Sequence, residues 1–157
     1  MVLKNNAGLT AAERVALARM PQRPGVEEYV DALFENVFEQ RGDRTASDDQ
    51  AIMCAIATFH GRPVTVVGHR KGSTIEQRMA FNFGMPSPEG YRKAQRSMRA
   101  AEKFGRPIIT FVDTPGAYPG LEAEEHGQGE AIARSIELMS ALKVPVICVI
   151  CGEGGSG

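Results

Sequence analysis

The sequence contains few cysteines, no surplus of charge of either sign, and no hydrophobic run close to the roughly 20 residues that a membrane-spanning helix needs. The three cysteines, Cys54, Cys148 and Cys151, lie in or beside apolar runs, and no Cys-x-x-Cys pair is accompanied by the histidines of a zinc site. A zinc site and a disulfide framework are therefore not expected, and the cysteine usage suits a reducing compartment.

The charges are balanced, with 18 Lys and Arg against 19 Asp and Glu and a formal net charge of −1 over 157 residues. A chain without a global electric field is not expected to bind nucleic acid or a membrane surface, so any anion must be recognised locally. The first residues lack a charged stretch followed by an apolar signal core, and we expect a cytoplasmic protein. Its composition, 43% hydrophobic and 24% charged, is typical of a globular domain.

Two helices are expected near the N-terminus. Thr10 and Glu13 form a capping-box pattern that opens a helix through about Arg19, and the prolines at 21 and 24 end it. From Val26 to Phe38 apolar residues recur at helical spacing. This spacing predicts a second helix with one apolar stripe, directed at a core or at a partner.

A β-hairpin and a third helix are expected next. Two β-rich runs at 51–58 and 63–68 flank a turn at 60–62, and the Gly- and Pro-rich stretch 68–88 then predicts a loop. Ser87, Pro88 and Glu89 supply an N-cap, a first-turn proline and an acidic first turn, which predict a helix to Phe104. A solvated face is the favoured interpretation for Arg96 and Arg99 on its basic side, which carries Arg92, Lys93, Arg96, Arg99 and Lys103.

The last third of the chain has a regular pattern: an apolar strand at 108–112, a Gly- and Pro-rich loop at 113–120, a helix at 122–142 and an apolar strand at 144–150. Apolar strands without alternation, separated by a helix, predict parallel pairing in an α/β sheet that is covered on both faces. A second Gly-rich turn follows at 152–157.

Both Gly-rich loops directly follow a strand, so in a parallel sheet both lie at the carboxyl edge, where open α/β sheets bind ligands. Glycines there let backbone N–H groups approach an oxyanion or a phosphate. Glycines can also serve only to make tight turns, and two loops at one edge favour a ligand site over this alternative.

Other chemistries fit the sequence less well. The spacing of Gly152, Gly154 and Gly157 matches a dinucleotide fingerprint, but this signal is weak, because the acidic residue expected about 20 positions later would lie beyond residue 157. The segment 113–116 resembles the magnesium-side loop of GTPases, but this sequence has no upstream Gly-x-x-x-x-Gly-Lys-Ser/Thr motif to bind the phosphates. Ser156 would form a nucleophile elbow only with a further glycine, and its candidate bases (His60, His69 and His126) are more simply turn or surface residues.

Five strings carry a resemblance to a known family: GHRKG at 68–72, NFGMPSPEGYRKA at 82–94, PIITFVDTPGAYPG at 107–120, EEHGQGEAIA at 124–133 and GEGGSG at 152–157. In order and spacing they resemble the alpha subunit of the carboxyltransferase of bacterial acetyl-CoA carboxylase. The resemblance implies a crotonase (ClpP/crotonase-like) fold of repeated ββα units, C-terminally incomplete and preceded by N-terminal helices. We expect an N-terminal helical segment at 1–45 and the first part of the carboxyltransferase domain at 46–157.

The resemblance also implies an activity: transfer of a carboxyl group from carboxybiotin, held covalently on the biotin carboxyl carrier protein, to acetyl-CoA, giving malonyl-CoA in the first committed step of fatty acid synthesis. The implied partner is a zinc-ribbon beta subunit in an α2β2 assembly, with biotin carboxylase in the holoenzyme. No metal is then expected in this chain, and no side-chain nucleophile is required.

The same resemblance implies the site residues. Backbone amides of the Gly-rich loops are expected to form the oxyanion hole, namely Gly154, Gly155, Ser156, Gly157, Gly116 and Ala117. Tyr118, Pro119 and Gly120 are expected to shape the biotin pocket. Arg70 and Lys71, which lie just after a strand and between two glycines, are expected to line the site and orient the ligand.

Three alternatives stay open. A related biotin-dependent decarboxylase or another acyl-CoA carboxylase would share the fold and change the acyl group. A non-catalytic assembly module would use the apolar stripe at 26–38 to dock the beta subunit. A serine hydrolase would use Ser156 as its nucleophile, and would be labelled there by a fluorophosphonate.

Overall fold

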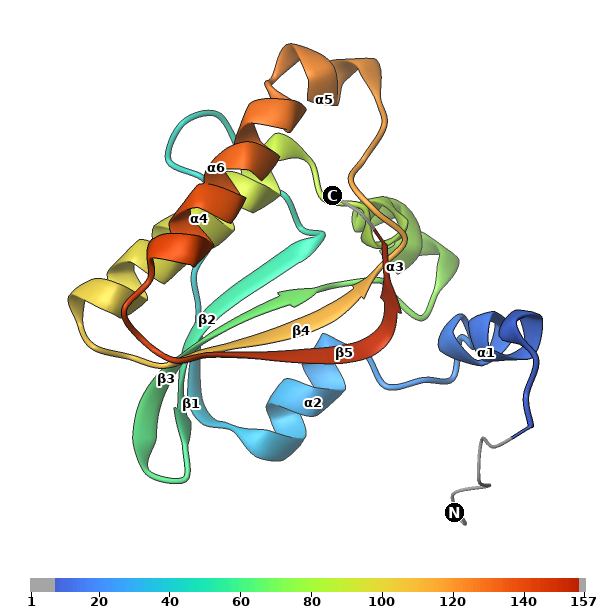
Figure 1. The fold of residues 1–157 in the computed structure, drawn as a ribbon, viewed down its shortest axis with the longest axis horizontal. Helices are drawn as coiled ribbons and strands as arrows, with labels where there is room; N and C mark the ends of the chain where they lie inside the picture. Colours follow the sequence, from blue (N-terminus) through green and yellow to red (C-terminus); the bar gives the residue numbers. More distant parts are fainter. Residues whose placement is uncertain (1–7, 156–157) are drawn as a thin grey trace.

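The computed structural model describes residues 8–155, which fold around a five-stranded sheet in the order β1-β2-β3-β4-β5 (Figure 1). The strands are β1 (Glu35–Glu39), β2 (Ile52–Phe59), β3 (Arg62–His69), β4 (Ile108–Thr114) and β5 (Val146–Gly154). The first three strands pair antiparallel, whereas β4 pairs parallel with both β3 and β5. The predicted parallel pairing of the two apolar strands is thus confirmed.

The predicted hairpin is confirmed as β2 and β3, which pair from Ile52 opposite His69 to Phe59 opposite Arg62. His60 and Gly61 connect the strands with positive φ angles of 47° and 76°. Two consecutive positive φ values define the turn whose twist matches the twist of the flanking strands. The turn is therefore two residues long, and Arg62 belongs to the strand.

The helices are α1 (Ala11–Ala18), α2 (Val26–Leu33), α3 (Ile75–Ala80), α4 (Pro88–Lys103), α5 (Leu121–Glu125) and α6 (Gln128–Ala141), with a 3₁₀ turn η1 (Asn82–Gly84). In Figure 1, α4 and α6 lie together on one face of the sheet and α2 lies on the other. None of the helices in the described part of the chain is long and apolar enough to cross a membrane.

Two apolar clusters fill the space between these layers. Val26 and Val30 of α2 pack with Phe34 and with one side of the strands, including Met53. The other side of the strands packs against α4, where Ala94, Met98 and Ala101 meet Ile52, Cys54, Val67 and Ile108. Neighbouring residues of β2 thus face opposite layers, as the twofold repeat of a strand requires.

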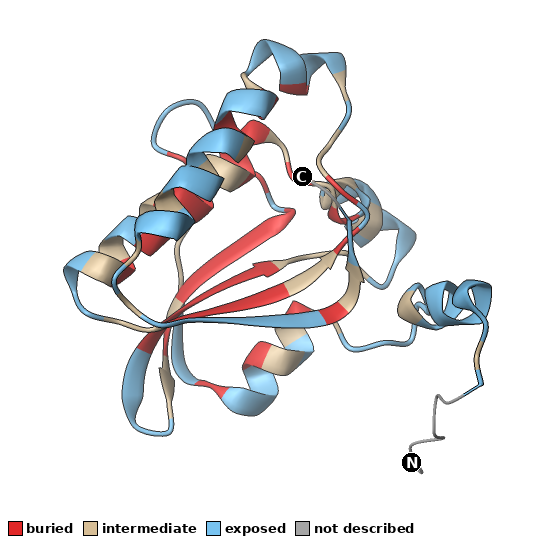
Figure 2. Cartoon of the chain, viewed as in Figure 1, coloured by how far each residue is buried: buried red, intermediate tan, exposed pale blue. Residues whose placement is uncertain are grey.

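The sheet is covered on both faces across β2, β3 and β4, but β5 is an exception (Figure 2). Residues 146–150 of this edge strand are all exposed, and Ile150 has a relative exposure of 66%. The apolar composition of β5 predicted burial, so this expectation was wrong for the strand within the described chain. Apolar composition reports what a strand can bury, and the neighbours decide whether it does.

The prediction of a helix from Val26 to Phe38 was wrong in its second half. Phe34 leaves the helical region (φ −124°, ψ 152°), and the following residues form β1, in which Phe38 pairs with Ile56. Asn36 takes a positive φ of 51° near a register shift in this ladder. The apolar stripe is consequently divided, because Val26 and Val30 are buried in this chain's own core whereas Phe38 is 67% exposed.

Two further boundaries differ from the sequence-based expectation. The stretch 68–88 is not all loop, since Thr74 and Gln77 form a capping box that opens α3. The helix expected at 122–142 is interrupted at Gly127, whose φ of 82° breaks the helical path between α5 and α6. The other predicted helices, α1 and α4, are confirmed close to their expected ends.

The segment 1–45, expected to be helical, contains β1 as well as α1 and α2. β1 pairs with β2, and α2 packs on the sheet, so this part of the chain shares the main core. The division at residue 45 stays a prediction.

Candidate functional site

The two Gly-rich loops lie next to each other. They follow β4 and β5, which are parallel neighbours, and Thr114 at the end of β4 pairs with Gly154 at the end of β5. The sequence predicted that both loops lie at one sheet edge, and the parallel pairing of the two strands brings them together there. The structure also shows how they are joined.

Thr114 is the residue that joins the loops, and its role was missed in the sequence. Its backbone carbonyl accepts a hydrogen bond of 2.8 Å from the amide of Gly155 in the second loop. Its hydroxyl accepts a hydrogen bond of 3.0 Å from the amide of Gly116 and donates one of 3.0 Å to the carbonyl of the same residue. Thr114 was expected in the loop at 113–120, whereas in the structure it is buried and is the last residue of β4.

Position 155 requires glycine because the backbone of the second loop touches the backbone of the first loop at Pro115 and Gly116. A Cβ atom on this residue would overlap the carbonyl of Pro115 and lie 2.8 Å from the amide nitrogen of Gly116, whereas real Cβ atoms stay beyond 3.0 Å. In the first loop, Gly116 has a φ of 148°, a conformation that residues with a side chain rarely adopt. Both glycines therefore have conformational or steric reasons to be glycine, independent of any ligand.

These contacts change how the expected amide donors can act. The amides of Gly116 and Gly155 donate to Thr114, so in this geometry neither points to an open site. Gly154 lies in the β5 ladder, and the amide of Ala117 has no hydrogen-bond acceptor among residues 8–155. Ser156 and Gly157 lie outside the described residues. The oxyanion assignment stays a prediction.

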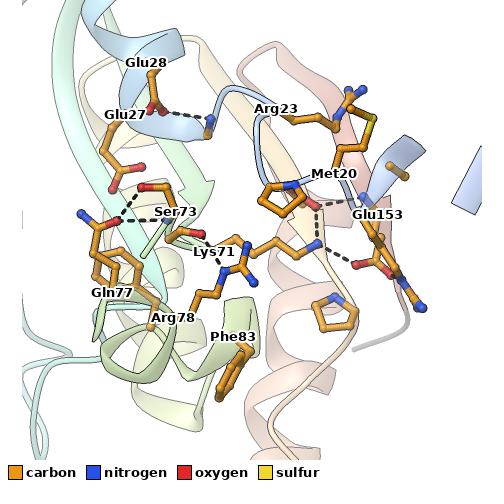
Figure 3. A pocket seen from close by; sticks show the side chains of 18 residues that line it. Met20, Arg23, Glu27, Glu28, Lys71, Ser73, Gln77, Arg78, Phe83 and Glu153 are labelled. Atoms are coloured by element: carbon orange, nitrogen blue, oxygen red, sulfur yellow. Dashed lines mark hydrogen bonds and ion pairs between the residues drawn. The ribbon is translucent and has the colours of Figure 1, made fainter. Parts of the chain in front are cut away.

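A cavity of about 400 Å³ lies at the carboxyl ends of β3, β4 and β5 (Figure 3). Lys71 from the end of β3 reaches into it and donates to Asp113 Oδ1 at 3.0 Å and to Glu153 Oε2 at 2.6 Å. The remaining wall comes from the segment between α1 and α2 and from the α3–η1 region, including Arg23, Arg78 and Phe83. The prediction that Lys71 lines a site is thus consistent with its place in the cavity wall.

Arg70 points elsewhere. Its guanidinium donates to Glu27 Oε1 and Glu39 Oε1, both at 2.7 Å, and lies over the ring of Phe81 at 5.8 Å. The side chain is only 12% exposed and joins α2 to β1. The structure therefore gives Arg70 a packing function, and a role toward a ligand stays a prediction.

Tyr118 lies at a second cavity of about 280 Å³, which is also lined by Asp48, Glu122 and His126. Its amide donates to the carbonyl of Pro86, and Gln128 Nε2 donates to the carbonyls of Pro86 and Tyr118, each at 2.9 Å. These bonds fix the loop to the start of α4. Pro119 is exposed, and the ring of Tyr118 occupies the space beside Gly120, which leaves no room for a side chain there.

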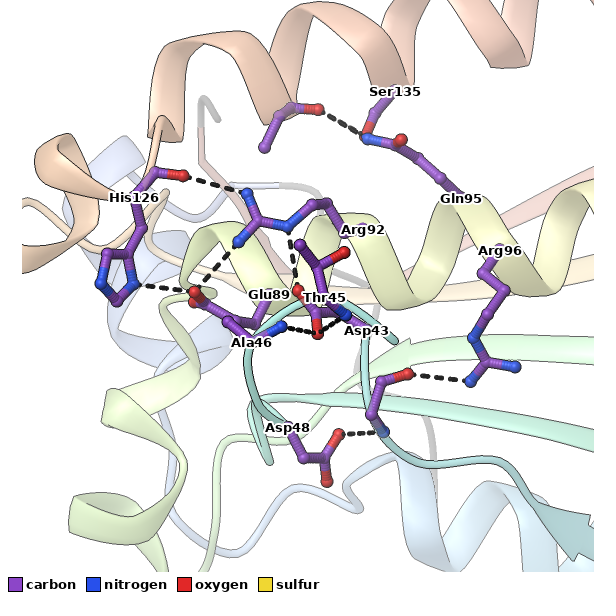
Figure 4. Close-up of polar contacts among 12 residues, drawn as sticks. Asp43, Thr45, Ala46, Asp48, Glu89, Arg92, Gln95, Arg96, His126 and Ser135 are labelled. Atoms are coloured by element: carbon purple, nitrogen blue, oxygen red, sulfur yellow. Dashed lines mark hydrogen bonds and ion pairs between the residues drawn. The ribbon is translucent and has the colours of Figure 1, made fainter.

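A polar network holds α4 to the segment before β2 (Figure 4). Burial alone would raise the pKa of Asp43, but hydrogen bonds from the amides of Thr45 and Ala46 and from Arg92 together lower this pKa below its ordinary value. Arg92 also binds Glu89, whose carboxylate contacts His126 Nδ1 at 2.8 Å. The network anchors the α5–α6 turn as well, because Arg92 donates to the carbonyl of His126.

The basic side of α4 is only partly a solvated face. Arg99 and Lys103 are exposed, as a solvated face requires. Arg96 donates to the carbonyls of Arg41 and Gly42, and Lys93 is fully buried, with its ammonium 2.6 Å from Asp48 Oδ1 and 2.6 Å from the carbonyl of Asp49. Lys93 and Arg96 are thus structural cations that join α4 to the loop before β2.

Solved structures of other proteins share the fold of this chain. Transcarboxylase 12S matches with a TM-score of 0.69 and 21% identity over 95% of this chain and 28% of that chain. The beta subunit of geranyl-CoA carboxylase from P. aeruginosa matches with a TM-score of 0.66 and 18% identity over 84% of this chain and 23% of that chain. The fold is the crotonase-like α/β fold of carboxyltransferases, which confirms the expected fold class.

Sequence comparison identifies the family. The model for the acetyl co-enzyme A carboxylase carboxyltransferase-like family matches residues 3–157, and the chain belongs to this family. It is 58% identical over 151 residues to the acetyl-coenzyme A carboxylase carboxyl transferase subunit alpha of Anoxybacillus flavithermus, covering 96% of this chain and 46% of that protein. The Bacillus subtilis counterpart is 56% identical over 145 residues, covering 92% and 45%. The chain spans about half the length of these relatives.

Proposed function

We propose that this chain is part of the alpha subunit of an acetyl-CoA carboxylase carboxyltransferase, which transfers a carboxyl group from carboxybiotin to acetyl-CoA to form malonyl-CoA. Membership of the family and the 58% identity to a named alpha subunit support this function. The structural observation that carries it is the junction of two Gly-rich loops at Thr114, at the carboxyl edge of parallel strands. This is the edge at which open α/β sheets bind their ligands.

The residues present fit the ureido group of biotin in part. The ureido oxygen accepts hydrogen bonds, and the amide of Ala117 is a donor with no acceptor among residues 8–155, in a loop where glycines leave the backbone bare. When bound, carboxybiotin supplies the carboxyl group and a nitrogen that can take a proton from acetyl-CoA. The contribution of this chain is then to place backbone N–H groups where negative charge develops, the term that commonly dominates such catalysis.

The hydrogen bonds of Thr114 hold the two Gly-rich loops in place in the free protein. A backbone donor contributes most when it is preorganised, because no reorganisation is then needed during the reaction. The bond from Gly155 to Thr114 and the two bonds between Thr114 and Gly116 fix both loops before any ligand arrives. No side-chain nucleophile is needed, and the fluorophosphonate test of Ser156 is expected to give no labelling.

The proposed partners follow from the proposed activity. They are a zinc-ribbon beta subunit in an α2β2 assembly, the biotin carboxyl carrier protein and biotin carboxylase. Within residues 8–155 no group of three or more His, Cys, Asp or Glu residues is arranged to hold a metal ion. In this proposal the zinc ion belongs to the beta subunit.

The proposal is tested by mixing the chain in its natural full length with the beta subunit, carboxylated biotin carrier protein and acetyl-CoA, and by measuring malonyl-CoA. Formation of malonyl-CoA that requires both subunits supports the proposal. If a stable complex forms and no malonyl-CoA appears, the proposed reaction is wrong.

A second candidate is transfer to a different acyl-CoA, because the matched structures are a transcarboxylase with methylmalonyl-CoA bound and a geranyl-CoA carboxylase. Offering propionyl-CoA and a longer acyl-CoA in the same assay separates the two, and we expect acetyl-CoA to give the highest kcat/KM. The assembly-module alternative loses part of its support, because Val26, Val30 and Phe34 of its proposed docking stripe are buried in this chain's own core. The other part of the stripe, Leu33, Val37 and Phe38, is exposed.

A further inference from the structure

Three charged residues converge at the carboxyl ends of three neighbouring strands, and Figure 3 labels two of them, Lys71 and Glu153. Lys71 follows β3, Asp113 lies near the end of β4 and Glu153 lies near the end of β5. The ammonium of Lys71 lies 3.0 Å from Asp113 Oδ1 and 2.6 Å from Glu153 Oε2. All three side chains are largely removed from solvent, with relative exposures of 27%, 16% and 14%. We call these three residues the strand-end clamp.

The clamp is connected to the backbone of the second Gly-rich loop. Asp113 Oδ1, the same oxygen that Lys71 binds, accepts a hydrogen bond of 3.0 Å from the amide of Glu153. The carboxylate also lies against Gly152, where a Cβ atom would come inside 3.0 Å of all three carboxylate atoms. The orientation of Asp113 therefore sets where residues 152 and 153 lie relative to β4.

The clamp is poorly suited to attract an anion. The single positive charge of Lys71 lies between two carboxylates, so the three residues together carry a net negative charge. Hydrogen bonding by Lys71 is the largest of the effects that lower the pKa of Glu153, and Arg19 contributes to the same lowering, while burial opposes it. Glu153 is thus held in its charged form, and Lys71 has its charge already matched within the chain.

We propose that Lys71 is a positioning residue, which holds Asp113 and Glu153 so that the second Gly-rich loop keeps its place against the first. The clamp fixes residues 152 and 153, and the bond from Gly155 to Thr114 fixes the loop two residues further on. This inference rests on the proposed carboxyltransferase function, since the loops matter to catalysis only there. It gives Lys71 a different role from direct contact with the ligand.

The test compares Lys71→Met, Lys71→Arg and Asp113→Asn in the full-length chain assembled with the beta subunit. Lys71→Met removes the charge and both bonds, Lys71→Arg retains a cation with several donors, and Asp113→Asn retains an oxygen that can accept from Glu153. Arg134→Met is the matched control, because Arg134 is an exposed cation of α6 that pairs with Glu130 and Glu137 and lies outside the cavity wall.

A positioning role predicts a split between kcat and KM. Lys71→Met is expected to lower kcat by about ten- to a hundred-fold, because a displacement of about 1 Å at a catalytic group has effects of this size. The KM for acetyl-CoA is expected to stay within about two-fold of wild type. Lys71→Arg and Asp113→Asn are each expected to retain most of the wild-type kcat, and Arg134→Met is expected to match wild type.

Amide hydrogen exchange gives a second measurement that needs no activity. In Lys71→Met the amides of Glu153 and Gly155 are expected to exchange about ten-fold faster or more, while Arg134→Met leaves them unchanged. A raised KM with unchanged kcat would overturn the proposal and make Lys71 a substrate-binding residue. A reduced kcat with unchanged amide exchange would also overturn it, because the loop would then have kept its place. If Lys71→Met does not fold, Asp113→Ala takes its place in both measurements, because it removes the bonds from Lys71 and from the amide of Glu153. Unchanged kcat in Asp113→Ala would then overturn the clamp. Inactive wild type would instead refute the carboxyltransferase function, and the exchange data would still test the clamp.

Discussion

Replacing Gly155 by alanine is the most direct test of the junction between the two loops. The added Cβ would overlap the carbonyl of Pro115 and approach the amide nitrogen of Gly116 to 2.8 Å. All of these atoms belong to the backbone, so no side chain can rotate away. The backbones must therefore separate by about 1 Å, which would break the 2.8 Å bond from the Gly155 amide to Thr114.

The expected loss is large in activity and small in stability. A misplacement of about 1 Å at a catalytic group costs roughly a hundred-fold in rate, equivalent to about 2.7 kcal/mol in the activation barrier. One lost hydrogen bond near the surface changes the free energy of unfolding by only about 1 kcal/mol. Gly155→Ala should therefore fold and assemble with the beta subunit while kcat falls.

The assay is malonyl-CoA formation by the assembled complex, with thermal unfolding measured on the same samples. Gly129→Ala is the matched control, because a Cβ on Gly129 in α6 meets nothing within 4 Å. This control should keep wild-type kcat and gain about 0.5–1 kcal/mol in stability, since alanine favours the helix. Wild-type kcat in Gly155→Ala would refute the argument that close contact between the loops is needed for catalysis.

Three further predictions address the residues around the site. Thr114→Val should lose about 1–3 kcal/mol of stability along with much of kcat, because Gly116 loses both hydrogen bonds to the hydroxyl. Thr114→Ser keeps a hydroxyl and should retain both hydrogen bonds. Urea unfolding and kcat measurements on both variants check this. Lys93→Met should destabilise the fold by about 2–4 kcal/mol in urea unfolding, because Asp48 loses its buried partner while staying partly exposed; a loss below the error of the measurement would contradict a structural role. Because the pKa of Asp43 is lowered in the folded state, its contribution to stability is fully present above the unfolded pKa of about 3.9 and is lost as the pH falls through the folded pKa; unfolding between about pH 7 and 3 should therefore show a steeper acid loss for wild type than for Asp43→Asn.

Local signals predicted much of the fold. The capping box at Thr10, the Ser87-Pro88 start of α4 and the β-rich runs around His60 act over a few residues, and each is confirmed within a short distance of its expected position. The capping box at Thr74 was an equally local signal that the Gly- and Pro-rich surroundings concealed. The helical spacing of the apolar residues predicted the wrong structure beyond Leu33, because the pairing of Phe38 with Ile56 in the sheet outweighed it.

The sequence by itself indicated the family through the resemblance of five motif strings. It also determined the parallel arrangement of the last strands and the position of both Gly-rich loops at one edge, because strand composition and loop order are properties of the chain. Only the tertiary structure decided what those loops do to each other. The bond between Gly155 and Thr114 joins residues about 40 positions apart, and Lys71 meets Asp113 and Glu153 across separations of 42 and 82 positions. No local pattern encodes such contacts, since they depend on the order and register in which β3, β4 and β5 pair.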